Sequence, residues 1–243
     1  ATASNTGGYA GTETATATLK TTDNDIAGIT IAQASTPLVT TEAGSTASFT
    51  VVLDAKPTDN VTVSITGNDS TEHQLSSSSL TFTTSNWNTA QTVTVSGVDD
   101  NLDDGDITTT LTATASNTGG YAGTETATTT VKNTDNDASG ITIAKTGSTD
   151  GSSNLLTTEA GGSSTFTVVL DAQPTANVTV TLSGADSTEH SLSSSSLTFT
   201  ADNWNTAQTV TVTGANDILV DGDITTTLTA IASNTGGYAG TET

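Results

Sequence analysis

The sequence repeats itself, and this repetition constrains the fold more than any other feature. Residues 113–126 restate residues 1–14 without a change, and residues 230–243 restate them with one change. The offsets are 112 and 117 residues, because five extra residues lengthen an early loop of the later copy, near residues 148–154. Self-similarity at this period predicts tandem copies of one structural unit.

The phase of the repeat predicts three segments. Residues 1–22 match the closing strands of a truncated preceding unit. Residues 23–134 form repeat one, and residues 135–243 form repeat two, whose last strand is cut short. We therefore expect the chain to be a window on a longer array.

Apolar and polar residues alternate over long stretches, which is typical of β-strands. Ala47, Phe49, Val51 and Leu53 share one face of a predicted strand, and similar period-two segments recur along the repeat. No segment has a helical period. The pattern predicts an all-β fold of tandem antiparallel Ig-like β-sandwiches, with about seven strands each.

The charge balance limits the possible partners. The chain has 26 acidic residues, four lysines and no arginine, which gives a net charge of −22. This charge repels nucleic acids and anionic lipids but suits multivalent cations. The chain has no cysteine, so neither disulfides nor thiolate metal sites hold it together. No apolar run is long enough to predict membrane insertion, and no signal peptide opens the sequence.

The acids of repeat one gather in the predicted loops. They are Glu42, Asp69, the run 99–106, and the closing pair Asp135 and Asp137. Alternate loops of a sandwich meet at one end, so we expect these side chains to meet at the end that faces repeat two. Such a group of oxygen ligands fits Ca²⁺, whereas Mg²⁺ requires stricter octahedral geometry and zinc requires His or Cys.

The alternative interpretation is a solvated acidic rim that only keeps the protein soluble. Repeat two allows a comparison, because three acids of the run recur there and two do not. A rim kept for solubility would not obviously retain three acids and lose two, so the comparison favours a metal site. The retained pairs are Asp100 and Asp217, Asp104 and Asp221, and Asp106 and Asp223; Asp99 becomes Asn216 and Asp103 becomes Val220.

Several motifs together resemble a known family. They are Thr-Thr-Glu-Ala-Gly around Glu42, the run Leu-Thr-Phe-Thr followed by Asn-Trp-Asn-Thr-Ala-Gln-Thr-Val-Thr-Val, the Asp-Gly-Asp loop, and the closing Asp-Asn-Asp. The sequence resembles the Calx-β type of Ig-like repeat found in giant secreted bacterial adhesins, including the RTX class. The resemblance covers nearly all of both repeats.

The resemblance implies Ca²⁺ ligands at the second-strand Glu, the mid-domain Asp, the late acidic loop and the closing acids. In repeat one these are Glu42, Asp69, Asp100, Asp104, Asp106, Asp135 and Asp137. In repeat two they are Glu159, Asp186, Asp217, Asp221 and Asp223, and Asp23 and Asp25 are the closing acids of the preceding unit.

Other residues suggest competing functions. Trp87 and Trp204 could stack on a sugar, as in a carbohydrate-binding module, but a lone Trp beside a strand more often closes the end of a core. His73 and His190 have no matched nucleophile, so we expect them to be loop residues and the protein not to be an enzyme. The Thr-rich strands resemble ice-binding faces, yet their alternation with apolar residues favours an ordinary solvent face.

The sequence thus predicts a calcium-stiffened spacer of an extracellular, cell-surface adhesin that holds a binding tip away from the cell. The alternatives are a carbohydrate- or ligand-binding sandwich and, third, an ice-binding face. We expect the neighbouring repeats to be its main partners. Residues 11–22, which repeat a closing strand, are predicted to form a strand and could support head-to-tail self-association.

Overall fold

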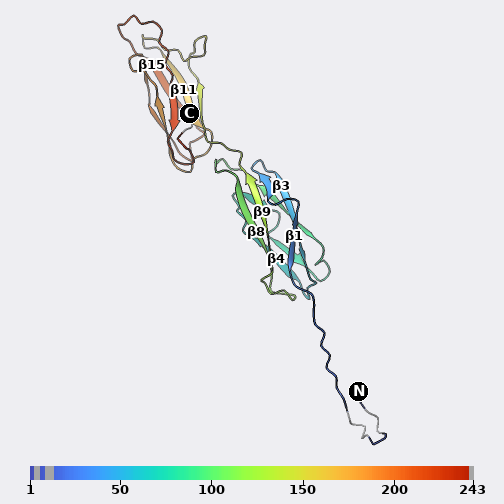
Figure 1. The fold of residues 1–243 in the computed structure, drawn as a ribbon. Helices are drawn as coiled ribbons and strands as arrows, with labels where there is room; N and C mark the ends of the chain where they lie inside the picture. Colours follow the sequence, from blue (N-terminus) through green and yellow to red (C-terminus); the bar gives the residue numbers. More distant parts are fainter. Residues whose placement is uncertain (3–5, 9–13, 241–243) are drawn as a thin grey trace.

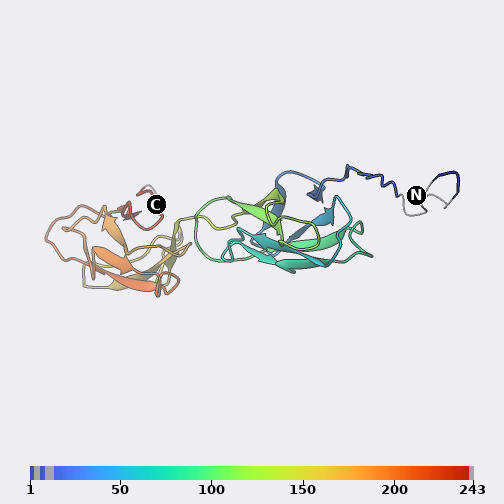
Figure 2. The same cartoon turned by 90° about the horizontal axis from the view of Figure 1, so that it is seen from below.

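The computed structural model describes residues 1–2, 6–8 and 14–240. Every element of regular secondary structure assigned in these residues is a β-strand, which confirms the all-β prediction. Figures 1 and 2 show two β-sandwiches that follow one another along the chain, with the N-terminal residues leaving the first sandwich at the end away from the second. The described residues contain no helix long and apolar enough to span a membrane.

The first sandwich packs two sheets with the strand orders β1-β3-β7-β5 and β2-β9-β8-β4-β6. All of its strand pairs are antiparallel except β2 and β9, which run parallel. Its strands are β1 (Ile29–Gln33), β2 (Leu38–Thr41), β3 (Thr46–Leu53), β4 (Val61–Thr66), β5 (His73–Leu75), β6 (Ser79–Phe82), β7 (Gln91–Gly97), β8 (Ile107–Ala115) and β9 (Thr126–Thr134).

The second sandwich packs the sheets β10-β11-β15-β13 and β14-β12-β16. Its second sheet has no counterparts of β2 and β9 among the described residues, so β16 lies at the edge. Its strands are β10 (Ile141–Lys145), β11 (Ser163–Leu170), β12 (Val178–Ser183), β13 (His190–Leu192), β14 (Ser196–Phe199), β15 (Gln208–Gly214) and β16 (Thr229–Ala232).

The period-two alternation places the apolar residues between the sheets. On β3, Phe49, Val51 and Leu53 are buried, while Ser48 on the opposite face is exposed. The predicted face of this strand is therefore confirmed. Trp87 and Trp204 are partly buried against the two cores, so their rings close the sandwiches instead of forming exposed platforms.

Tyr121, in the loop between β8 and β9, is 3% exposed and belongs to the core of the first sandwich. Its hydroxyl donates to the carbonyl of Ala55 at 2.9 Å and accepts from the Ala55 amide at 3.3 Å. This ring therefore joins the loop after β8 to the loop after β3. Tyr238 makes the same contacts with Ala172 in the second sandwich.

One sequence prediction about local structure is wrong. His73 and His190 were expected in loops, but each begins a short strand, β5 or β13, and is buried because that strand pairs with the central strand of its sheet. Residues 15–22, which were expected to form a strand, are exposed and have no strand partner among the described residues of the same molecule. Residues 11–13 of that prediction lie outside the described residues.

Candidate metal centre

A parallel strand pair brings together the first group of acids. β2 and β9 are aligned so that their last residues, Thr41 and Thr134, are partners. The amide of Glu42 continues this ladder by donating to the carbonyl of Thr134 at 3.2 Å. The acids that follow the two strands are therefore neighbours, and carboxylate oxygens of Glu42, Asp135 and Asp137 lie within 4.8 Å of one another.

A second pairing, β5 with β7, assembles another group. His73 is the partner of Gly97, and the next amide, that of Val98, donates to the carbonyl of Glu72 at 2.9 Å. This places Glu72 beside the acidic loop that follows β7. Carboxylate oxygens of Glu72, Asp100 and Asp104 consequently lie within 4.8 Å of one another.

The close approach of β2 to the end of β7 depends on a glycine. A Cβ atom added to Gly97 would collide with the carbonyl oxygen of Thr41 and with the side-chain oxygen of Asn133. Any larger residue would push Glu42 away from the loop after β7. Gly214 has the same role in the second sandwich, against the carbonyl of Thr158.

Asn133, which is 1% exposed, connects the strands beneath the two acid groups. Its side-chain amide donates to Glu72 at 3.3 Å and to the carbonyl of Val98 at 3.1 Å. Its side-chain oxygen accepts from the hydroxyl of Thr40 at 3.0 Å. A polar partner of this kind holds ligand carboxylates in orientation.

The linker between the sandwiches passes directly over the acids. The backbone amide of Asn136 donates to Glu42 at 3.0 Å, and its side-chain amide donates to Glu42 and to Asp99 at 3.2 Å each. Asp135 accepts from the amide of Gly105 at 2.7 Å and from that of Asp137 at 2.7 Å. The linker and the acidic loop are thus folded onto each other.

The electrostatics of the centre are unfavourable without a cation. Burial, with added repulsion from Asp135 and Asp100, raises the pKa of Glu42 to about 7. Burial also raises the pKa of Glu72, and further repulsion comes from Asp104 and Asp100. The pKa values of Asp104 and Asp137 are raised by burial and then by their acidic neighbours.

The structure describes a salt bridge near the centre, between Lys132 and Asp106, but it does not neutralise either of the two acid groups. Lys132 reaches Asp106 at 2.6 Å and lowers the pKa of that carboxyl group. Asp106 in turn accepts from the amide of Asp135 at 3.2 Å. Asp106 is therefore engaged by a lysine on β9 and is outside both acid groups.

The donor set fits a hard divalent cation. Each group offers three carboxylates and has no sulfur or imidazole donor, which is the ligand chemistry that Ca²⁺ takes. Glu42 and Glu72 are 2% and 5% exposed, so a bound cation would face little competition from water on that side. The residues present therefore fit Ca²⁺.

The remaining predicted ligands lie elsewhere. Asp69 and Asp186 each hold a turn, accepting from the amide and the hydroxyl of Thr71 or Thr188, and these bonds lower their pKa values. Asp23 and Asp25 are exposed in the N-terminal segment. Glu159 and Asp223 are exposed beside a groove of the second sandwich and join no acid group.

Sequence reasoning overlooked Glu72 and its counterpart Glu189. Among its described residues, the second sandwich contains one acid group, Glu189 with Asp217 and Asp221, again within 4.8 Å. Burial raises the pKa of Glu189, and the charges of Asp221 and Asp217 add to the rise. The sequence signal for these glutamates is the tetrapeptide Ser-Thr-Glu-His, which occurs in both repeats and places each glutamate directly before the histidine.

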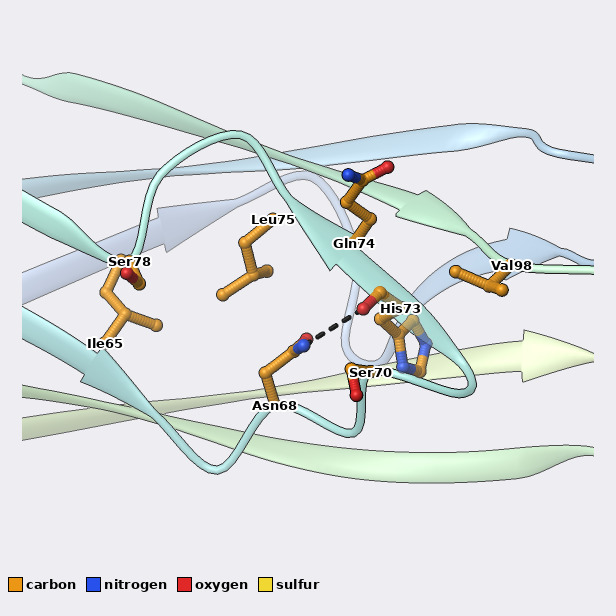
Figure 3. Close-up of a pocket in the computed structure, with 8 residues that line it drawn as sticks. All are labelled: Ile65, Asn68, Ser70, His73, Gln74, Leu75, Ser78 and Val98. Atoms are coloured by element: carbon orange, nitrogen blue, oxygen red, sulfur yellow. Dashed lines mark hydrogen bonds between the residues drawn. The ribbon is translucent and has the colours of Figure 1, made fainter.

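A pocket of about 510 Å³ lies beside β5 and is lined in part by His73 (Figure 3). The side-chain amide of Asn68 donates to the backbone carbonyl of His73 at 3.0 Å across it. The His73 ring is buried, and burial lowers its pKa, which favours the neutral imidazole. In the part of the chain that the structure describes, the ring nitrogens make no hydrogen bond, so His73 packs as a core residue.

No protein-family model matches the sequence, and no curated protein matches it. Among solved structures the chain is similar to CBD12 of CALX1.2, at 15% identity and a TM-score of 0.33, over 80% of this chain and 77% of that one. It is similar to the calcium binding domain CBD12 of CALX1.1, at 17% identity and a TM-score of 0.31, over 75% and 74%. The YadV chaperone gives 10% identity and a TM-score of 0.32, over 86% and 94%. The resemblance to Calx-β domains is therefore weak and at the level of the fold, and at these scores it carries no functional conclusion.

Proposed function

We propose that this chain is a calcium-stiffened spacer, a pair of β-sandwich repeats from a large extracellular adhesin that holds a binding tip away from the cell surface. The observation that carries the proposal is the position of Glu42, buried under the linker and grouped with the linker acids Asp135 and Asp137. A cation held there would tie the path of the chain between the repeats to the first sandwich.

The chain's own residues explain how the joint would respond to calcium. Without the cation the grouped carboxylates repel one another, which the raised pKa values of Glu42 and Asp137 express. Bound Ca²⁺ would supply the positive charge that lets all of them remain ionised. The linker would then lose its freedom to move away from Glu42.

The joint also has direct polar contacts with the second repeat. Asp103 accepts from the amide of Ser139 at 2.7 Å, and the carbonyl of Asn101 accepts from the amide of Gln173 at 2.7 Å. Both acceptors belong to the acidic loop. An ordered loop would thus fix the second sandwich as well as the linker.

The proposed extracellular setting predicts the affinity of the site. Extracellular Ca²⁺ modules bind with dissociation constants of about 10⁻⁴ to 10⁻³ M, and crowded carboxylates bind more tightly. We expect calorimetric titration with Ca²⁺ to give values in or below this range and Mg²⁺ to bind more weakly. Identical thermal unfolding in Ca²⁺ and in EDTA would rule out the metal site.

The stiffening itself is tested by small-angle scattering in saturating Ca²⁺. Replacing Asp135 and Asp137 by alanine should increase the flexibility between the repeats while both cores stay folded. Alanine at Asp23 and Asp25 is the matched control, because these residues form the same local turn, with the Asp25 amide donating to Asp23 at 3.1 Å, but lie in no acid group. If the first double variant scatters like the parent, calcium does not stiffen the joint.

A further inference from the structure

The pocket beside β5 lies between the two sheets, at one side of the first sandwich. β5 is the edge strand of one sheet, and β4 belongs to the other sheet. The loop of residues 67–72 connects the two strands, and its residues Asn68 and Ser70 line the pocket. All of the lining residues belong to the first repeat.

The side chains around the pocket are apolar or neutral and polar. In the view of Figure 3, Ile65 and Leu75 lie on one side of Asn68, while Ser70 and the His73 ring lie on the other. None of the described residues that line the pocket is a lysine or a carboxylate. The wall therefore offers hydrogen bonds and apolar contact but no charge.

Three buried polar atoms in this pocket lack a hydrogen-bond partner among the described residues. They are the side-chain oxygen of Asn68 and both ring nitrogens of His73, which is 1% exposed. The side-chain nitrogen of Asn68 is engaged, because it donates to the carbonyl of His73 at 3.0 Å. Buried polar groups without partners destabilise a folded protein unless a molecule outside the chain completes their hydrogen bonds.

The three atoms require both a donor and an acceptor from their partner. A neutral imidazole has one donor nitrogen and one acceptor nitrogen, and the oxygen of Asn68 is a second acceptor. A hydroxyl group donates and accepts at the same atom, whereas a carboxylate only accepts and an ammonium group only donates. Neighbouring hydroxyl groups therefore suit this pocket best.

The size and the surroundings of the pocket narrow the partner further. A single water molecule takes up only about 30 Å³ and gains nothing from the apolar wall of Ile65, Leu75 and Val98. Small-molecule sites typically measure about 300–1,000 Å³, which includes this pocket. Asp69 and Glu72 adjoin lining residues in the sequence, and their charges disfavour an anion.

The second repeat does not present the same atoms. Ala185 stands at the position of Asn68. His190 is the counterpart of His73, and its Nε2 atom lies 3.2 Å from the hydroxyl of Thr226. The chain therefore contains an internal comparison for the site.

We propose that the pocket beside β5 binds a neutral polyhydroxyl compound the size of a monosaccharide. The hydroxyl groups of this ligand bond to Asn68 and to the ring of His73, and its carbon-bound hydrogens pack on Ile65 and Leu75. Recognition of such a ligand goes beyond the spacer function and does not depend on the calcium joint.

Titration of the 243-residue chain with glucose, mannose and galactose, followed by NMR in EDTA, tests the proposal without calcium. The chain has two histidines, so the spectrum contains one set of imidazole signals for His73 and one for His190. At least one sugar should shift the His73 signals with a dissociation constant of about 10⁻³ M, as expected for a ligand of about 12 non-hydrogen atoms. No shift by any of these sugars at ~50 mM, far above that constant, means that the pocket holds water alone and overturns the proposal.

The uronate of the sugar that binds tests the requirement for a neutral ligand. It carries a carboxylate in place of the terminal CH₂OH group, so the charges of Asp69 and Glu72 should weaken its binding by about tenfold or more. Equal affinities of the sugar and its uronate would contradict the assignment to a neutral compound.

Two variants separate binding from folding. His73→Phe keeps a ring in the core and removes both nitrogens, so it should abolish the sugar-induced shifts of the Leu75 methyl signals without lowering the midpoint of thermal unfolding. Asn68→Ala introduces the residue that the second repeat has at this position, and it should weaken binding by about tenfold. His190→Phe is the matched control and should leave the shifts of the His73 signals unchanged.

Unchanged sugar affinity in both Asn68→Ala and His73→Phe would overturn the proposal. Where the larger ring of phenylalanine prevents folding, Asn68→Ala decides alone. A loss of affinity in His190→Phe would place the sugar on the second sandwich and would equally overturn it.

Discussion

Replacing Glu42 by glutamine should stabilise the metal-free protein and destabilise the calcium-loaded protein. The pKa of Glu42 rises from 4.5 to about 7, chiefly through burial. A carboxyl group with a raised pKa binds a proton more readily in the folded than in the unfolded state. Its contribution to folding stability therefore falls as the pH rises from 4.5 to about 7, and the full penalty is present above that range.

The size of this penalty follows from the pKa rise. At about 1.4 kcal/mol for each pKa unit, a rise from 4.5 to about 7 costs about 3 kcal/mol of folding free energy. Glutamine keeps the shape of the side chain and the hydrogen-bond acceptor but removes the charge. In EDTA above neutral pH, the midpoint of thermal unfolding of the first sandwich should therefore rise by roughly 10 °C.

Calcium should reverse the order of stability. The parent gains about 4.1 kcal/mol when Ca²⁺ is at a thousandfold excess over its dissociation constant, which is more than the penalty of about 3 kcal/mol. Glutamine offers one neutral oxygen in place of a carboxylate, so the variant gains less. Calorimetric or circular-dichroism unfolding in EDTA and in Ca²⁺, at about pH 5 and about pH 8, would show the crossover only at the higher pH.

Glu159→Gln is the matched control, because the same pentapeptide surrounds it but its side chain is exposed and lies in no acid group. It should shift stability little under any of the four conditions. A Glu42→Gln variant that is less stable than the parent at pH 8 in both EDTA and Ca²⁺ would refute the reasoning, as would an equal crossover at Glu159.

Three further outcomes are expected. Glu72→Gln should weaken calcium binding at its site by about tenfold or more in calorimetry, because one charged carboxylate is lost. Asp69→Asn alters only a turn, so it should leave the calcium affinity and stoichiometry unchanged. Tyr121→Phe should lower the free energy of unfolding in urea by about 1–3 kcal/mol, because the buried backbone groups of the loop after β3 lose their partner; an unchanged midpoint would contradict this. Gly97→Ala should both destabilise the first sandwich and reduce its calcium affinity, since the added methyl group would push Thr41 and the adjacent ligand outwards; lost stability with normal affinity would separate that strand end from the site.

The strands could be read from the sequence because their signal is local. The alternation around Phe49, Val51 and Leu53 has a period of two wherever one face of a strand is buried, and the structure buries that face. The concentration of acids in loops was likewise visible without coordinates. The short strands β2 and β5 were not, because segments of four and three residues carry too little periodicity.

Membership of the acid groups was decided by pairing between distant segments. Glu42 meets Asp135 because β2 runs parallel to β9, and Glu72 meets Asp100 because β5 pairs with β7. No spacing along the chain contains this information. For the same reason, sequence alone could not separate Asp69, which holds a turn, from the acids that meet.

The two copies of Thr-Thr-Glu-Ala-Gly give the sharpest comparison. Both copies determine a glutamate at the same place in the repeat, at Glu42 and at Glu159. Glu42 is buried among acids because β9 aligns β2 and the linker folds over its carboxylate, whereas Glu159 is exposed beside a groove that no strand fills in the described chain. The sequence supplied the glutamate, and only the non-local strand pairing decided whether its carboxylate faces other acids or water.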